Sequence, residues 1–125
     1  MTTLRSLALG VLLTMLLPAL PASAHDPKPR HGGAIVLTAT YHVEMVIKDG
    51  QVDVYLTGHD DKPVAATGRK GVAILMTGGK SVRVPLEAAG AERLTGKTAE
   101  ALPAGAKGVV QITEPAGGTI QARFN

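Results

Sequence analysis

The sequence predicts an all-β domain, most simply a single immunoglobulin-like β-sandwich of about seven short antiparallel strands. Short runs of alternating apolar and polar residues recur along the chain, and glycine-containing turns separate them. No segment keeps apolar residues at helical spacing over several turns, and only Glu87–Arg93 suits a single helical turn. A small β-barrel is the alternative architecture, because composition does not distinguish the two.

The first 24 residues have the organisation of a secretory signal peptide. Arg5 precedes the apolar run Leu7–Leu17, and Pro18 ends that run. The Ala-Ser-Ala sequence that follows fits a signal peptidase site, so we predict cleavage after Ala24. The apolar run is shorter than the ~20 residues that a membrane-spanning helix needs, so no stable membrane anchor is expected after cleavage. We therefore expect the mature protein, His25–Asn125, to work in the bacterial periplasm or outside the cell.

The mature chain reads as an arm followed by one domain. Residues 25–33 are rich in His, Pro and Gly and are expected to be extended and flexible, and residues 34–125 form the β domain. Asp49-Gly50 is the strongest hairpin signal, because both positions of such a turn favour a positive φ. The predicted strands are Ala34–Ala39, Tyr41–Lys48, Gln51–Thr57, Val72–Thr77, Ser81–Leu86, Gly108–Thr113 and Thr119–Phe124, with a short strand or irregular stretch at Arg93–Lys97.

Composition and motifs exclude several function classes. Loss of Arg5 takes the 13 basic residues to 12 against 10 acidic ones, a net charge of about +2. The basic residues are scattered and aromatic residues are scarce, so nucleic-acid binding is not expected. There is no cysteine, so packing, sheet hydrogen bonds or a bound metal must hold the domain together. No nucleophile elbow, HExxH motif or phosphate-binding loop is present, and we predict that the protein is not an enzyme. Met45 and Met76 lie in apolar strand patterns and are predicted to pack in the core.

The predicted hairpin separates an apolar face from a polar one. Side chains alternate between the two faces of a strand. The face predicted to lie against the core carries Val43, Met45, Ile47, Val52, Val54 and Leu56. The two-residue turn sets His42 opposite Thr57 and Glu44 opposite Tyr55 on the other face, and His59 can fold over the same end of the hairpin.

The four histidines, His25, His31, His42 and His59, all fall within the first 35 residues of the mature chain. Imidazole and carboxylate ligands suit Zn(II) or Cu(II), so His42, Glu44 and His59 are candidate ligands; alternatively, His42 and Glu44 only face water. As the first residue after cleavage, His25 can chelate Cu(II) through its amine and imidazole, or it is merely the residue that the cut leaves.

His31 stands where the arm meets the first strand. The two glycines that follow permit a tight turn that can bring His31 back over the hairpin, and the alternative is a flexible hinge with an incidental histidine. The loop Gly58–Pro63 contains two aspartates, which suit either a metal or a solvated turn.

Several segments carry a resemblance to a known group of proteins. They are His31-Gly32-Gly33, Val43-Glu44, the run from Val54 to Val64, Gly71 before an apolar strand, and Ala122-Arg123-Phe124. These segments resemble small uncharacterised periplasmic proteins often found beside heavy-metal or copper efflux systems, and the N-terminal region of some efflux adaptor subunits. The resemblance implies a role in handling Cu, Zn or a related cation and points to His31, Glu44 and His59. Relatives commonly carry Asp where this chain has Gly58, so one possible ligand is missing.

The sequence therefore predicts a periplasmic protein that binds Cu(II) or Zn(II) and buffers or delivers it, accessory to heavy-metal resistance or efflux. The candidate ligands are His25, His31, His42, Glu44 and His59, and the choice between the N-terminal histidine and the hairpin face stays open. The rival prediction is a metal-free interaction module that docks to an efflux adaptor through a sheet edge.

Overall fold

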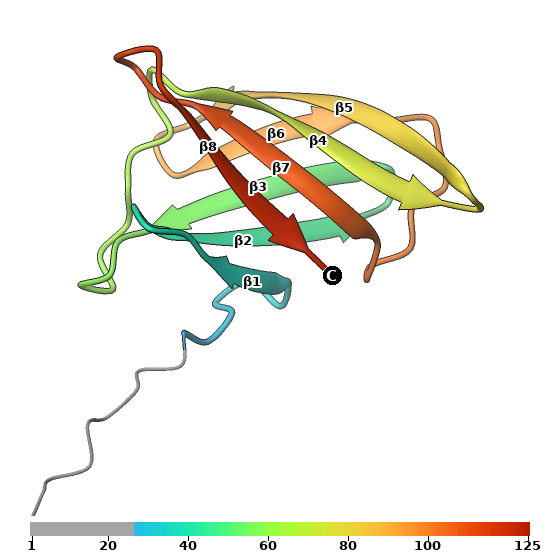
Figure 1. Ribbon diagram of the computed structural model, residues 1–125, viewed down its shortest axis with the longest axis horizontal. Helices are drawn as coiled ribbons and strands as arrows, with labels where there is room; N and C mark the ends of the chain where they lie inside the picture. Colours follow the sequence, from blue (N-terminus) through green and yellow to red (C-terminus); the bar gives the residue numbers. More distant parts are fainter. Residues whose placement is uncertain (1–26) are drawn as a thin grey trace, which may run out of the picture.

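The computed structural model describes residues 27–125, and all regular secondary structure within them is β (Figure 1). The all-β prediction is confirmed, with eight strands. They are β1 (Ala34–Leu37), β2 (His42–Lys48), β3 (Gln51–Thr57), β4 (Lys70–Thr77), β5 (Lys80–Ala89), β6 (Arg93–Lys97), β7 (Lys107–Thr113) and β8 (Thr119–Phe124). Residues 27–125 contain no helix with the length and apolar character needed to cross a membrane. The predicted signal peptide lies outside the described residues.

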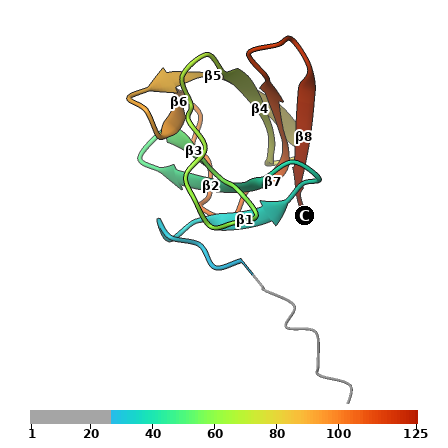
Figure 2. The ribbon, with the colours of Figure 1, turned by 90° about the vertical axis from the view of Figure 1, so that its left-hand side faces the viewer.

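The eight strands form one continuous antiparallel sheet in the order β1-β2-β3-β6-β5-β4-β7-β8. The sheet curls around the core until β1 and β8 come into contact, and Figure 2 shows the resulting, nearly closed ring. Within the described residues, no hydrogen-bonded ladder joins β1 to β8. The architecture is therefore that of the small barrel, the alternative in the prediction, rather than a sandwich of two separate sheets.

The short strand β6 is the reason for this architecture. It pairs with β3 along one side and with the end of β5 along the other, so it joins the strands that a sandwich would divide between two sheets. Gly96 lies at this junction, where a Cβ atom would stand 2.3 Å from the carbonyl oxygen of Pro85. Only glycine allows the two backbones to approach so closely.

The end of β5 corrects one local prediction. The segment Glu87–Arg93 was expected to suit a helical turn, but its first three residues continue β5 and pair with β6, and Gly90 turns the chain with a φ of 68°. The ladder with β6 satisfies backbone groups of these residues through partners only four to eight positions further along the chain. A single helical turn gains few such bonds, because nucleating a helix is unfavourable.

The β2–β3 hairpin has the predicted register. Asp49 and Gly50 adopt φ values of 52° and 73°, and the ladder pairs Lys48 with Gln51. The predicted inner face of the hairpin is buried, with exposures of 7% or less. Met45 packs in the core as expected, but Met76 is 49% exposed, because its position on β4 points to the outer face.

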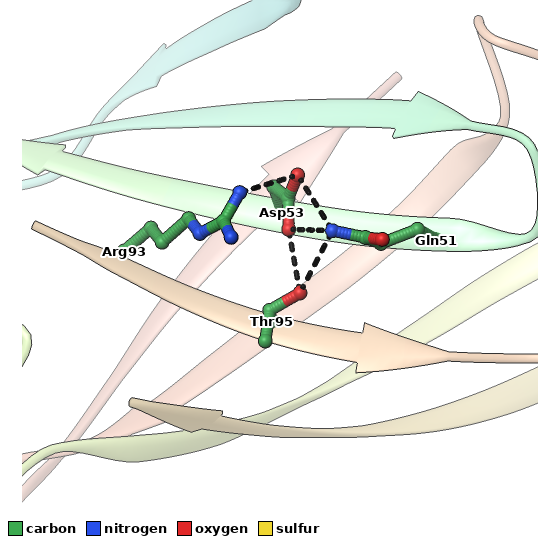
Figure 3. Close-up of polar contacts among 4 residues, drawn as sticks. All are labelled: Gln51, Asp53, Arg93 and Thr95. Carbon is green, nitrogen blue, oxygen red and sulfur yellow. Dashed lines mark hydrogen bonds and ion pairs between the residues drawn. The ribbon is translucent and has the colours of Figure 1, made fainter. Parts of the chain in front are cut away.

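A polar cluster on the outer face ties β3 to β6 (Figure 3). The Asp53 carboxylate accepts hydrogen bonds from Thr95 Oγ1 at 2.6 Å and from Gln51 Nε2 at 3.0 Å, and it forms an ion pair with Arg93 at 3.4 Å. These contacts join the two strands on the side opposite the apolar core, and they reinforce the β3–β6 pairing on which the barrel depends.

A second polar cluster lies at the start of β2. The Tyr41 side chain is 2% exposed, and its hydroxyl donates to the Glu114 carboxylate. Arg69 forms an ion pair with the same carboxylate at 2.9 Å and donates to the carbonyl oxygen of Ala65 at 2.6 Å. Burial of the ring raises the pKa of Tyr41, and the hydrogen bond to Glu114 and the negative charge there raise it further, against a smaller opposing effect of Arg69. The phenol is therefore held as a neutral donor.

Candidate functional site

The outer face of β2 is covered by two segments from elsewhere in the chain. His42 and Glu44 point away from the core, as predicted, yet they are only 7% and 4% exposed. The N-terminal arm runs over Glu44, and the loop that follows β3 places His59 against His42. The alternative that these two side chains only face water therefore does not describe the structure.

Glu44 holds the arm in place. Its two carboxylate oxygens accept hydrogen bonds from the backbone N–H groups of Arg30, His31 and Gly33 at 2.9–3.0 Å. The Nδ1 atom of His31 lies 2.9 Å from the same carboxylate. Burial by itself raises the pKa of Glu44, but these four contacts, led by the one from the His31 ring, outweigh burial and lower the pKa. Glu44 is thus a charged anchor for the arm.

The arm turns back over the hairpin at the two glycines, as predicted. Gly32 has a φ of 76°, and a Cβ at Gly33 would stand 2.2 Å from the carbonyl oxygen of Met45, so the arm lies directly on β2. The His31 ring stacks on the Tyr55 ring with 3.5 Å between centroids and 6° between planes. His31 is therefore fixed against β3 and Glu44 and is not an incidental residue on a loose hinge.

His42 and His59 form a separate pair. The Nε2 atom of His42 lies 3.0 Å from Nδ1 of His59, and the two rings meet edge to face. The other nitrogen of His59, Nε2, lies 3.3 Å from the carbonyl oxygen of Ala39. Because a carbonyl oxygen only accepts, Nε2 of His59 carries the proton there. In the neutral pair, His59 Nδ1 is then the acceptor and His42 Nε2 the donor.

A surface pocket of about 330 Å³ opens onto this histidine pair. His42, His59 and Asp61 form one side, and the arm residues 27–30 form the other. Arg30 links the two sides of the pocket by donating from its guanidinium to the carbonyl oxygen of Asp61 at 2.9 Å. No sequence pattern marks the arm as a wall of this pocket, because only the fold brings residues 27–30 beside the loop after β3.

The structure thus groups the predicted ligands into two pairs, His31 with Glu44 and His42 with His59. Within residues 27–125, no three His, Cys, Asp or Glu side chains come together closely enough to hold one metal ion. His25 lies outside the described residues. Of the two aspartates in the loop after β3, Asp61 lines the pocket, and Asp60 accepts from the backbone N–H of Lys62 at 3.2 Å.

Comparison of the chain with known protein families, curated proteins and solved structures finds no match in any of the three.

Proposed function

We propose that this protein is a periplasmic carrier, rather than an enzyme, that binds Cu(II) or Zn(II) through His42 and His59 and buffers or delivers the ion as an accessory to heavy-metal resistance. The observation that carries the proposal is the 3.0 Å separation between the two facing ring nitrogens at a pocket open to solvent.

The separation of the two nitrogens suits joint ligation. An ion that binds both nitrogens at about 2.0–2.1 Å, with an angle of 90–109° between them, sets them about 2.8–3.4 Å apart. The pair is within that range before any ion binds. On binding, the two nitrogens would keep nearly their present separation, while each ring turns so that its lone pair points at the ion and no longer at the partner nitrogen.

The protons of the pair also suit ligation. The hydrogen bond from His59 Nε2 to the Ala39 carbonyl leaves His59 Nδ1 unprotonated, and its lone pair accepts the hydrogen bond from His42 Nε2 until an ion replaces that proton. Such a bond from the outer nitrogen to a backbone carbonyl is the usual way in which a metal-binding imidazole is oriented. His42 must move its proton from Nε2 to Nδ1, and its Nε2 lone pair then becomes available.

Further ligands have two sources in this proposal. Asp61 lines the same pocket and would supply a carboxylate through a bridging water. Cleavage after Ala24 would leave His25 two positions before Pro27 in the sequence, and Pro27 lines the pocket, so we include the amine and ring of His25 as candidate further ligands. The N-terminal site and the hairpin site of the sequence analysis would then be one site.

Calorimetric titration of the chain that begins at His25 with Zn(II) and with Cu(II) tests this proposal. We expect about one equivalent bound with micromolar or tighter affinity, and His59→Gln should weaken binding more than tenfold, since a ligand is lost. His31→Gln is the matched control, because His31 belongs to the other pair, and it should bind nearly as the parent does. Absence of binding for both metals, or equal affinity in the two variants, would show that the proposal is wrong.

A chain with one extra N-terminal glycine separates the two sources of ligands. If the amine of His25 takes part, this extension weakens Cu(II) binding, whereas the His42–His59 pair alone is unaffected by it.

A further inference from the structure

The outer face of β5, β4, β7 and β8 has an apolar centre. Val72, Ile74 and Val109 point outward and are only half-buried, and Met76 beside them is 49% exposed. In the ring of strands these lie across the barrel from β2 and the histidine pair (Figure 2). Whatever this face does is therefore independent of the proposed metal site.

Two arginines flank this apolar centre in one row across the sheet. The ladders pair Arg83 with Ile74, Ile74 with Val109, and Val109 with Arg123. Neighbouring strands are about 4.8 Å apart, so the two arginines stand about 14 Å apart along the surface. Lys107 lies on the same face, two residues along β7 from Val109.

The basic side chains of this face are not neutralised within the domain. In the described part of the chain, Arg83, Lys107 and Arg123 take part in none of the ion pairs. The acidic residue on these four strands is Glu87, which stands opposite Lys70 at the far end of the β4–β5 ladder. Exposed arginines bind carboxylates through two parallel hydrogen bonds, so the complement of this face is an acidic surface with an apolar centre.

The composition of the face favours a protein partner over a lipid surface. Surfaces that bind bilayers commonly insert aromatic side chains at the interface. Of the three Tyr and Phe residues in the chain, Tyr41 and Phe124 are buried and Tyr55 lies on β3, away from this face. An apolar centre with arginine at its edge is instead the usual make-up of a protein–protein contact.

We propose that the outer face of β5, β4, β7 and β8 docks a partner protein through an extended segment that carries two carboxylates on either side of an apolar residue. In an extended chain, side chains at i and i+4 lie on one face about 13–14 Å apart. That spacing matches the distance between Arg83 and Arg123. The apolar residue between the carboxylates would then lie over Ile74 and Val109.

The probe for this surface is the peptide acetyl-Glu-Thr-Val-Thr-Glu-amide. It is titrated into the chain that begins at His25, and binding is followed through the backbone amide chemical shifts of that chain. We expect saturable shifts confined to the amides of β4, β5, β7 and β8, with a dissociation constant of about 1 mM, as suits so small a ligand. The same peptide with both glutamates replaced by lysine should give no such shifts. The exposed double variant Arg83→Glu/Arg123→Glu should weaken binding about tenfold, because attraction becomes repulsion.

The control variant is Lys48→Glu/Lys97→Glu, which changes the net charge equally at exposed positions on other strands. Its dissociation constant for the acidic peptide should be within twofold of the parent's. An equal loss of affinity in both double variants would mean that binding depends only on long-range charge, and this would overturn the proposal. No shift at 5 mM peptide, or shifts spread over the whole surface, would overturn the proposal. A lipid ligand would also overturn the proposal. In that case the parent protein, but not Arg83→Glu/Arg123→Glu, would bind vesicles of phosphatidylglycerol and phosphatidylcholine, and the parent would not respond to the peptide.

Discussion

Replacing Glu44 with alanine should release the N-terminal arm while leaving the barrel folded. The substitution removes the acceptor of three backbone N–H groups and of the His31 ring. Hydrogen bonds to a buried charged group contribute about 1.5–3 kcal/mol. The released donors can reach water once the arm detaches, so the total loss is limited to the docking free energy, and we expect about 1.5–3 kcal/mol rather than a sum over four bonds.

Trypsin reports this release directly. The Arg30–His31 bond is a tryptic site in the docked arm, whereas Lys28 is followed by proline and resists cleavage. If cleavage requires local opening, a loss of 1.5–3 kcal/mol raises the cleavage rate after Arg30 by about 10–150-fold. Asp53→Ala is the matched control, since it removes another outer-face carboxylate that accepts several hydrogen bonds but none from the arm. Cleavage of Glu44→Ala at the rate of the parent, or of both variants at the same raised rate, would refute the role of Glu44 as the anchor.

The lowered pKa of Glu44 gives this contact a defined pH dependence. The group is deprotonated in the folded protein at pH values where the unfolded chain already binds a proton. Its stabilising contribution is therefore complete above the ordinary glutamate range near pH 4.3 and is lost as the pH falls through the lower, folded pKa. Urea unfolding of the parent and of Glu44→Gln should differ most at neutral pH and converge in acid.

Two further substitutions test the barrel itself. Tyr41→Phe should lower the free energy of unfolding by about 1–2 kcal/mol, because Glu114 loses a buried donor. Since the folded pKa of Tyr41 is raised, the stabilising contribution of its neutral hydroxyl is complete below the ordinary tyrosine range near pH 10 and is lost as the pH rises through the folded pKa. Between pH 8 and pH 11, the free energy of unfolding in urea should therefore fall more for the parent than for Tyr41→Phe. An equal fall in the two proteins would contradict this. Gly96→Ala should lower the free energy of unfolding by about 1–3 kcal/mol, measured by thermal unfolding, because its Cβ would meet the Pro85 carbonyl oxygen. Gly105→Ala is the control and should leave this free energy nearly unchanged, because a Cβ there meets nothing within 4 Å.

Local rules were sufficient to predict the β2–β3 hairpin from the sequence. Asp49 and Gly50 both adopt the positive φ that the turn needs, and a two-residue turn leaves one register in which the apolar residues share a face. That register also placed His42 and Glu44 together on the outer face. The sequence could not show that this face is covered, because the cover comes from the arm and from the loop after β3.

The division of the candidate ligands into two pairs was decided by tertiary contacts. Glu44 and His42 are two residues apart on the same face, yet Glu44 is occupied by backbone donors of the arm and His42 by His59. Backbone N–H groups are present at every position that is not proline, so no residue pattern marks which of them will reach a particular carboxylate.

By itself, the sequence determined an all-β chain and the register and two faces of the β2–β3 hairpin, because period-2 alternation and turn chemistry act over a few residues. Tertiary structure alone decided between sandwich and barrel. That choice depends on β6, five residues that pair with β3 about 40 positions earlier and with the end of β5. Such a strand gains its stability from partners distant in sequence and from the close approach at Gly96, and neither is visible until the chain has folded.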